Sequence, residues 1–427
     1  MNRAYSNREM EKTFKLSNRG KMLSKNEKND LEILKIKRKR KKYNKKREPY
    51  NSDKISEQQF TDTIHSNNKI KRNGLKFIHT TLPDKSNIEI DNRNNYHIKK
   101  ISYISNLTKD SYSEYSLNDT FSVFKSISDI FYLVYADYNK SIIFINLIHK
   151  QKINEIKNAH NCYITNIKHY FDTSKKLDLI LSVSGYDNNI KLWDLNNLQC
   201  LIRLDNINKE GYLFSACLLN EKNENYIITS NCNFHRNAEP IKVYDMNSSK
   251  IKEINDSKIN TMFIEQYYDN NLCIQYIITG NDSFVQSYNY DINKIYHKYY
   301  DSQCKDCHIN IIINNRKKGI IELIESSFDG NIRIWDFHSG IFLKKIKVSQ
   351  DWLFGLCLLE EEELLLIGCG DKAIKLIDLK NNSIIGNLFG HNNHIITIKK
   401  INLFNNERII LSQGIINDQI RIWNIKN

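Results

Sequence analysis

The sequence has little of what bends a chain or links it covalently: its 427 residues include 3 Pro, 14 Gly and 9 Cys. The cysteines are odd in number and irregularly spaced, so they indicate reduced thiols rather than a disulfide framework. Lys, Asn and Ile are abundant, as in proteins encoded by AT-rich genomes. Because Asn tolerates turn conformations, we expect it to stand where turns would otherwise use Gly.

Long apolar runs are also missing. No run approaches the roughly 18 residues of a membrane span, and the first residues lack the apolar core of an export signal. The sequence contains no P-loop, nucleophile elbow or metal-binding motif. We therefore expect an intracellular, non-enzymatic protein with no membrane contact, no cofactor, no metal and no small-molecule substrate.

Positive charge is concentrated near the N-terminus. Residues 1–50 hold 18 Lys and Arg against 6 Asp and Glu, which accounts for most of the net charge of +14. Up to residue 95 the chain shows no sustained apolar period, so it buries too little surface to offset the entropy of ordering. Residues 1–95 are predicted to be a disordered basic arm, and residues 96–427 the folded domain.

The densest part of the arm is a cationic run between residues 35 and 47. Such runs resemble nuclear localisation signals, and they also bind the phosphates of RNA or DNA through release of counterions. A nuclear or nucleolar address, with contact to an import receptor, ranks first, RNA contact second and a solvated tail third. The run contains Lys37, Arg38, Lys39, Arg40, Lys41, Lys42, Lys45, Lys46 and Arg47.

A short phrase recurs along the rest of the chain. Its best copies end in Trp193-Asp194, Trp335-Asp336 and Trp423-Asn424, and weaker copies have Tyr or Ile in place of Trp. The seven marker positions are 145, 193, 244, 288, 335, 377 and 423, which lie 42 to 51 residues apart. In the best-formed repeat, residues 163–169, 179–184, 190–195 and 199–204 are expected to be four strands. A repeat of about 45 residues built from short strands predicts an all-β array of seven units.

This period and signature resemble the WD40 repeat, in which each repeat forms one four-stranded blade of a β-propeller. The resemblance covers about three quarters of the chain and implies a seven-bladed ring. The last repeat ends after its third strand, which would leave an open sheet edge. Because rings of this family close with an N-terminal strand, we expect residues 96–105 to supply the missing strand.

The resemblance also implies a buried hydrogen-bonded network of His, Ser or Thr, Asp and Trp in each blade. Such groups are tolerated inside a protein when each has a partner. Catalysis by a His–Asp pair is disfavoured here, because no nucleophile recurs beside it. In blade 7 the aligned Asp position holds Asn417, with Asp418 beside it. The expected network residues are His160, Asp187, Trp193, Asp329, Trp335, Asp371, His391 and Trp423.

In propellers, loops on one face surround the centre of the ring, and partners commonly dock there. Aligning the residues that begin each inner strand, and those before the turn Asp, predicts a partner-binding rim on that face. Exposed aromatic residues with polar tips are typical of interface hot spots. The predicted rim consists of Tyr163, Tyr186, Tyr212, Lys258, His308, Phe328, Trp352 and His394.

These observations favour a WD40-type scaffold for protein–protein interactions in an intracellular, nuclear multiprotein assembly. One alternative is an RNA-associated component, of a ribonucleoprotein or of ribosome biogenesis, whose basic arm contacts RNA. The other is a substrate receptor of a ubiquitin ligase. Some such receptors carry Trp-Asp-x-Arg after the third strand, and this mark is absent after Trp193 and Trp335.

Overall fold

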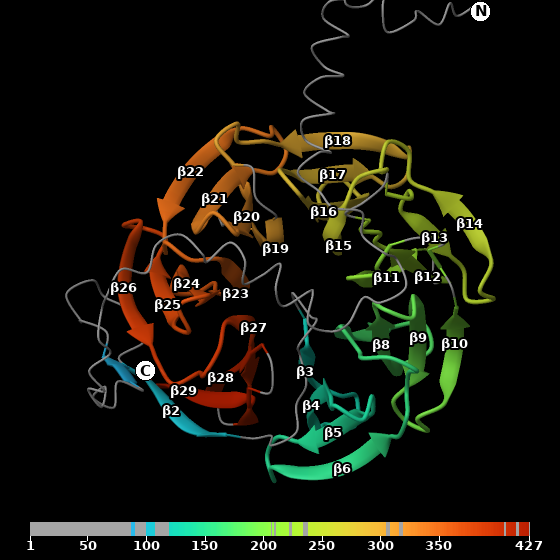
Figure 1. Ribbon diagram of the computed structural model, residues 1–427, viewed down its shortest axis with the longest axis horizontal. Coiled ribbons are helices and arrows are strands. Elements are labelled where there is room, and N and C mark those ends of the chain that lie inside the picture. The colour runs from blue at the N-terminus through green and yellow to red at the C-terminus, as the bar shows by residue number, and fades with distance from the viewer. Residues whose placement is uncertain are drawn as a thin grey trace, which may run out of the picture. The chain divides into compact units, whose positions relative to one another are not determined.

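The computed structural model describes residues 87–89, 100–106, 119–205, 207–208, 211–221, 224–233, 238–304, 308–315, 319–404, 407–415 and 418–426. The strands of this part form seven antiparallel sheets, six with four strands and one with five. Figure 1 shows these sheets arranged as blades around a common centre. The all-β, seven-bladed fold predicted from the sequence is confirmed.

Blades follow one another in chain order, with the first strand of each nearest the centre (Figure 1). Blade 1 consists of β3 (Phe121–Lys125), β4 (Phe131–Ala136), β5 (Ile142–Asn146) and β6 (Gln151–Ile156). Blade 2 consists of β7 (Asn166–Asp172), β8 (Leu177–Ser184), β9 (Asn189–Asp194) and β10 (Cys200–Leu204). Blade 3 consists of β11 (Ala216–Glu221), β12 (Glu224–Thr229), β13 (Lys242–Tyr244) and β14 (Lys250–Glu253). Blade 4 consists of β15 (Thr261–Asp269), β16 (Ile274–Asn281), β17 (Val285–Asn289) and β18 (Lys294–Tyr299). Blade 5 consists of β19 (His308–Asn315), β20 (Ile321–Ser327), β21 (Asn331–Asp336) and β22 (Phe342–Lys347). Blade 6 consists of β23 (Leu353–Leu359), β24 (Leu364–Cys369), β25 (Ile374–Asp378) and β26 (Ser383–Leu388). Blade 7 consists of β27 (Ile395–Asn402), β28 (Arg408–Gly414), β29 (Arg421–Lys426), β2 (Lys100–Asn106) and β1 (Asn87–Glu89).

An N-terminal strand closes blade 7. Strand β2 pairs antiparallel with β29, from Lys100 opposite Lys426 to Asn106 opposite Arg421. Figure 1 shows β2 along the outer side of β29. The closing strand predicted at residues 96–105 is confirmed, and its described part begins at Lys100.

The sequence does not predict β1, which pairs with β2 as a fifth strand. This strand falls inside the predicted arm of residues 1–95, so regular structure reaches beyond the predicted boundary, to Asn87. Its three residues, Asn-Ile-Glu, are too few to show an alternating apolar pattern. The rest of the predicted arm, including the basic run, lies outside the described residues.

In blades 1 to 6, the Asp or Asn after the marker residue lies at the end of the third strand and makes the turn to the fourth. Asp194 Oδ1 accepts a hydrogen bond from the backbone N–H of Asn196, and Asp378 Oδ1 accepts one from Lys380, both at 2.8 Å. Equivalent turns are made by Asn146, Asp245, Asn289 and Asp336. A short polar side chain that bonds the backbone just ahead of it stabilises such turns. The recurring Trp-Asp step therefore combines a packing residue with a turn residue.

Opposite the marker residue, each outer strand carries a β-bulge. The register of β10 skips Leu201 opposite Trp193, and that of β22 skips Leu343 opposite Trp335. The donated strand β2 skips Ile104 in the same way, opposite Trp423. Because a bulge bends and twists its strand, β2 has the shape of a regular outer strand. The other skipped residues are Ile153, Ile251, Tyr296 and Ile385.

Apolar side chains of adjacent blades pack against each other and form the core. Trp423 of blade 7 is fully buried and lies in one cluster with Leu366 and Leu376 of blade 6.

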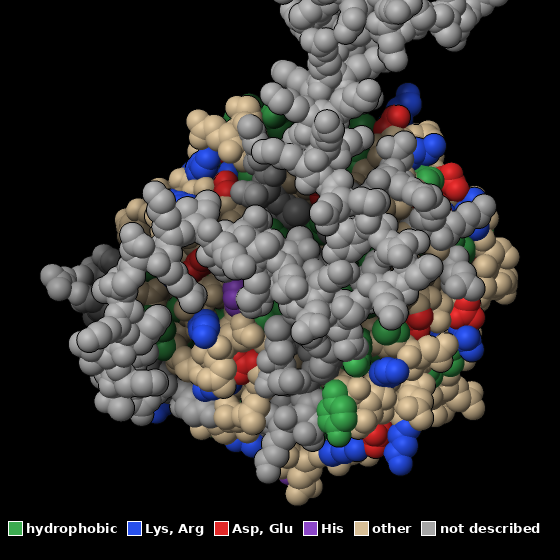
Figure 2. All heavy atoms as spheres, viewed as in Figure 1, with side chains coloured by type: hydrophobic (Ala, Val, Ile, Leu, Met, Phe, Trp, Pro, Cys, Tyr) green, Lys and Arg blue, Asp and Glu red, His purple; other side chains and the backbone are tan. Residues whose placement is uncertain are grey.

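On the face drawn in Figure 2, the described Lys or Arg and Asp or Glu side chains are interspersed around the outer part of the ring. The inner strand of blade 2 begins at Asn166, later than the predicted residue 163, which leaves Tyr163 in the preceding loop.

Candidate functional site

Two aromatic groups lie on the face that carries the loops leading into the inner strands, which we call the rim face. The opposite face carries the turns between the first and second and between the third and fourth strands, and we call it the turn face. In the first group, Tyr186 after β8 meets Tyr212 before β11, with ring centroids 5.3 Å apart. Tyr186 is exposed and Tyr212 is half-buried.

The second group joins blades 5, 6 and 7. Phe328, in the turn after β20, stacks on Trp352 with ring centroids 4.8 Å apart. The Trp352 ring lies 6.1 Å from that of His394, and Phe354 contacts both Phe328 and Trp352. Phe328, Trp352 and His394 are each half-buried, so part of each ring stays accessible.

One apolar cluster connects the two groups. Tyr212, Phe328 and Trp352 all pack against it. We call its buried members the floor, and they come from blades 3, 4, 6 and 7: Phe214, Cys232, Met262, Phe354, Ile396 and Ile415. The rim aromatics therefore rest on one buried apolar cluster that links blades 3, 4, 6 and 7.

Backbone hydrogen bonds fix the position of two rim residues. The carbonyl of Trp352 accepts a bond from the N–H of Gly370, and the carbonyl of His394 accepts one from Ile415, both at 2.8 Å. A Cβ added at Gly370 would lie 3.2 Å from His394 Nδ1 and 3.4 Å from the Trp352 nitrogen. The absence of a side chain at Gly370 thus lets Trp352 and His394 lie close together.

Three of the predicted rim residues lie apart from these groups. Tyr163 is half-buried, and Lys140 Nζ lies 5.8 Å from the centre of its ring. Lys258 is exposed between β14 and β15. The backbone of His308 pairs with Ser327 at the start of β19, but its side chain is outside the described part.

Charged side chains from four blades meet below the floor. Lys168 Nζ of β7 lies 2.9 Å from Glu265 Oε2 of β15 and 3.6 Å from Asp119 Oδ2 beside β3. Lys399, which follows the floor residue Ile396 along β27, also pairs with Asp119. Burial alone would lower the pKa of Lys168, but Glu265 and Asp119 raise it above its usual value. These ionised groups tie blades 1, 2, 4 and 7 together across the ring.

Blade 7 holds a complete hydrogen-bonded network beside the rim. Trp423 Nε1 donates to Ser412 Oγ at 2.8 Å, and Ser412 Oγ lies 2.7 Å from His391 Nε2. His391 Nδ1 in turn lies 2.9 Å from Asp418 Oδ2. Asp418, beside the aligned position 417, therefore supplies the carboxylate. The network fixes the loop that carries His394 into β27.

Blade 2 has the same Trp–Ser–His chain without its carboxylate end. Trp193 Nε1 donates to Ser182 Oγ at 2.8 Å, and His160 Nε2 lies 2.8 Å from the same oxygen. Asp187 Oδ2 instead accepts two backbone N–H bonds from the loop after His160, both at 3.2 Å. Neither Ser182 nor Ser412 is among the predicted network residues. Their common spacing of 11 residues before Trp is the signal that identifies them.

Both histidines of these networks are neutral at physiological pH. Burial, with smaller effects of Lys191 and Arg203, lowers the pKa of His160 to about 3. Burial also lowers the pKa of His391, although Asp418 acts in the opposite direction. A neutral imidazole accepts a hydrogen bond from the serine hydroxyl and leaves no unpaired buried charge. The His–Asp pairing in this fold thus serves a structural purpose.

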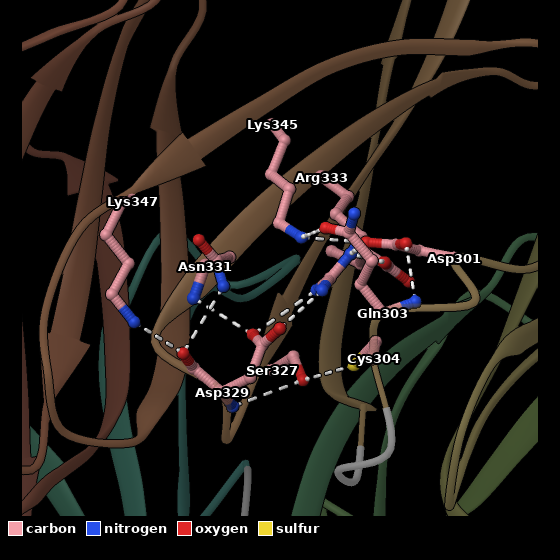
Figure 3. Close-up of polar contacts among 10 residues, drawn as sticks. Asp301, Gln303, Cys304, Ser327, Asp329, Asn331, Arg333, Lys345 and Lys347 are labelled. Atoms are coloured by element: carbon pink, nitrogen blue, oxygen red, sulfur yellow. Dashed lines mark hydrogen bonds and ion pairs between the residues drawn. The ribbon is translucent and has the colours of Figure 1, made fainter.

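Blade 5 uses charge in place of this network (Figure 3). The fully buried Arg333 donates from Nε to Asp301 Oδ2 at 2.9 Å, and its other nitrogens bond both oxygens of Asp329. Lys345 Nζ also bonds Asp301, at 2.9 Å, and the buried Glu325 lies 4.0 Å from Arg333. Burial alone would raise the pKa values of Asp301 and Asp329, but hydrogen bonds hold both below their usual value. Asp329 follows Phe328 directly, so the ion network positions a rim residue.

The other predicted network residues of blades 5 and 6 also have different partners. Trp335 packs on Tyr299 and Phe342, and its Nε1 has no hydrogen-bond partner in the described residues. Asp371 lies 2.7 Å from Lys375 Nζ and accepts a bond from Ser349 Oγ at 3.2 Å. These pairs could not be read from the family pattern, because blades 5 and 6 have no His in the equivalent loop.

The described residues contain no group of three or more His, Cys, Asp or Glu side chains placed to hold a metal ion. Within the same ranges, no helix has the length and apolar character needed to cross a membrane. What the rim face offers is a set of partly accessible aromatic rings, several with polar tips, that rest on a buried apolar cluster. Such a surface suits the binding of another protein.

No family model matches the chain. A stretch of 73 residues is 26% identical to the U3 small nucleolar RNA-associated protein 21 homolog of Schizosaccharomyces pombe (strain 972 / ATCC 24843). The matched stretch covers 17% of this chain and 8% of that protein. The chain therefore matches less than a tenth of the length of that relative.

Proposed function

The chain is a WD40-repeat β-propeller protein, and from this premise we propose that it is a non-enzymatic scaffold that binds protein partners on its rim face. The observation that carries this proposal is the shared floor beneath Tyr212, Phe328 and Trp352. Aromatic side chains that are half-accessible and firmly packed from below lose little entropy on binding. They are the residues from which interface hot spots are built.

The non-enzymatic part of the proposal rests on how the histidines are used. His160 and His391 each bond to a serine that also accepts a bond from a tryptophan. Their imidazoles are buried and neutral, so they are occupied within the blades. We place the scaffold in an intracellular assembly, and the basic run of residues 37–47 favours a nuclear or nucleolar one.

The test replaces Tyr212 and Trp352 together by Ala and measures partner capture by proximity labelling with the full-length protein. We expect labelling of rim partners to fall at least about tenfold, as for the loss of two hot-spot residues. The matched control replaces Ile127 and Ile148, which are exposed on the turn face of blade 1. Unchanged labelling by the rim variant would contradict the proposal.

Because Tyr212 and Trp352 are half-buried, a second variant guards against a loss of folding. Tyr186 is 37% exposed, so Tyr186→Asp changes the rim with little effect on the core. Circular dichroism should show the same β content and a melting temperature within a few degrees of the wild type for this variant. Reduced labelling in a folded Tyr186→Asp protein would support rim binding independently.

A second candidate function is that of an RNA-associated component. It is favoured by the basic run and by the name of the relative, which describes a small nucleolar RNA-associated protein. In this case the arm would bind RNA while the propeller binds proteins. A salt-dependent RNA pull-down that is lost on deletion of residues 1–50 would favour it, since phosphate contacts weaken steeply with salt.

A further inference from the structure

The turn face of blades 4 and 5 carries an apolar surface that the rim does not involve. Each of its eight large side chains is 39% to 62% exposed. The blade 4–5 patch consists of Tyr268, Leu272, Ile292, Ile295, Ile320, Ile341, Phe342 and Leu343. Leu343 occupies the bulged outer-strand position that is apolar in other blades too, and Ile295 pairs with the marker Tyr288 in β18, but the other six lie in or beside turns. In the described residues, the corresponding turns of the other five blades expose Ile127, Ile148, Phe171 and Phe404.

Hydrogen bonds between the two blades make the patch continuous. His338, in the turn before β22, lies 2.8 Å from Asp269 Oδ2, which follows Tyr268. His338 Nδ1 also lies 3.1 Å from the hydroxyl of Tyr296, the neighbour of Ile295. Blades 4 and 5 are adjacent in Figure 1. The turn that bears Ile341 and Phe342 is therefore held against the turns of blade 4.

Within each blade, backbone bonds hold neighbouring turns together. Tyr290 N donates to the carbonyl of Gln275 at 2.9 Å, which places the turn of Ile292 beside the turn of Leu272. In blade 5, Phe337 N donates to the carbonyl of Ile321 at 2.8 Å. This bond places Ile320 beside the turn of Ile341. The described residues of the patch thus lie in or beside neighbouring turns of blades 4 and 5 rather than as scattered side chains.

The size of the patch matches one side of a protein–protein interface. A fully exposed aliphatic or aromatic residue presents roughly 200 Å², so the eight residues together expose on the order of 800 Å². Stable interfaces bury about 800 Å² on each partner, and monomers rarely leave such a surface uncovered. A single second molecule of this chain would supply an equal surface.

Two exposed side chains of opposite charge lie beside the patch. Asp291 and Lys294 are both exposed and flank the most exposed residue of the patch, Ile292. In a twofold interface, the same surface faces its own copy, so a self-complementary pair of opposite charges is favoured. A twofold axis near Ile292 would bring Asp291 of each copy to Lys294 of the other.

We propose that the blade 4–5 patch is the interface of a homodimer with twofold symmetry. The dimer buries the eight apolar side chains of both copies and pairs Asp291 with the second copy's Lys294. Because the patch lies on the turn face, both rim faces point away from the interface. The dimer therefore presents two identical rims, which raises the apparent affinity for partners that carry more than one binding segment.

Sedimentation equilibrium of the full-length protein tests this proposal. The wild type should be a dimer, and Ile292→Asp with Ile341→Asp should weaken self-association at least about 100-fold, because each copy then buries two charges. The matched control is Ile127→Asp with Ile148→Asp, at positions 50% and 41% exposed on the same face of blade 1, and it should remain dimeric. Circular dichroism checks that both variants are folded.

Charge reversal at the exposed residues Asp291 and Lys294 provides a second test. Asp291→Lys and Lys294→Asp should each weaken the dimer, and the double exchange should restore it, because the pair is re-formed with reversed polarity. A wild type that stays monomeric at about 100 µM overturns the proposal. This holds even if the patch then proves to bind a different protein. A dimer that survives the Ile292 and Ile341 changes, or that is lost in the blade 1 control, overturns it as well.

Discussion

In blade 7, the loop before the inner strand is tied to the sheet by a neutral chain that runs from Trp423 through Ser412 to His391. In blade 5, the turn that bears Phe328 is tied by the buried Arg333 between Asp301 and Asp329. Both devices hold the backbone beside a rim residue. The comparison shows that both repeats hold the backbone beside a rim residue in place, but with different side-chain chemistry. Removing one group from a neutral network costs only the hydrogen bonds of that group. Removing one charge from a buried ionic network leaves the opposite charges without compensation, which costs more.

The largest effect is expected from removal of Arg333. Arg333→Leu leaves Asp329 and Glu325 without their buried counter-charge and leaves Asp301 with Lys345, and breaking such a network costs about 3–5 kcal/mol. Chemical denaturation should show a correspondingly lower free energy of unfolding, or no folded protein. The solvent-exposed Lys347→Leu, at the end of the neighbouring strand β22, is the control and should change stability by less than about 1 kcal/mol. Equal effects of the two changes would contradict the role of Arg333.

How far this comparison could be read from the sequence differs between the two blades. The period of the marker residues predicted seven units, because every blade needs the same packing and turn residues at the same place. The closing strand and, in outline, the neutral network were implied by the resemblance to the WD40 repeat. Arg333 was missed, because its partner Asp301 belongs to the preceding loop, 32 residues away, and the family pattern does not link these two positions. Strand β1 was missed because three residues carry no period.

In blade 7 the family spacing falls on Asn417, with Asp418 beside it, and Asp418 bonds His391. Spacing within a strand is fixed by the pleat, but spacing through a turn is not, so a carboxylate one residue further along reaches the same histidine. The rim was placed by the same alignment of loops. The contacts of Tyr186, Tyr212, Phe328, Trp352 and His394 follow from folding and could not be derived from spacing alone.

The second-largest effect on stability is expected from removal of the Ser412 hydroxyl, the central group of the blade 7 network. Ser412→Ala removes the hydroxyl between Trp423 Nε1 and His391 Nε2, and two buried polar groups lose their partner. We expect a loss of about 2–3 kcal/mol in the free energy of unfolding, measured by urea denaturation. Ser412→Thr, which keeps a hydroxyl, is the control. A loss as large as that of Arg333→Leu would remove the distinction between the two devices.

Lowering the pH is expected to destabilise the neutral and the ionic networks over different pH ranges. His160 has a pKa of about 3 in the folded state, against about 6.5 when unfolded, so its contribution is complete above pH 6.5 and is lost as the pH falls. Between pH 7 and pH 5 this linkage costs about 2 kcal/mol, and the lowered pKa of His391 acts in the same direction. The pKa values of Asp301 and Asp329 are depressed, so their contribution persists at pH 5 and is lost only below the unfolded value of about 3.9.

Denaturation at pH 7 and pH 5 measures this difference. The wild type should lose stability over this interval, and His160→Asn should lose about 2 kcal/mol less, because the titrating group is gone. Arg333→Lys should leave the pH dependence of this interval unchanged. A pH dependence that is the same in wild type and His160→Asn would show that His160 is not buried in its neutral form.

The smallest effect compares the two carboxylates of the neutral networks. Asp418→Asn weakens a bond to His391 and two to the backbone, and we expect a loss of about 1–2 kcal/mol. Asp187→Asn keeps an acceptor for the two backbone bonds and breaks no bond to His160, so a loss below about 1 kcal/mol is expected. Thermal melts of both variants rank them, and the reverse order would contradict the hydrogen bonds assigned to blades 2 and 7.

Both kinds of network hold residues of the rim, and the central claim is that this face meets the partner. A photo-crosslinking amino acid placed at Tyr186 tests the claim most directly, because the side chain is exposed beside Tyr212. The same amino acid at Phe404, 51% exposed on the turn face of blade 7, provides the comparison. We expect the amino acid at position 186 to give a crosslinked product with one partner, and position 404 to give no product of the same mass. Crosslinks from position 404 alone would contradict it.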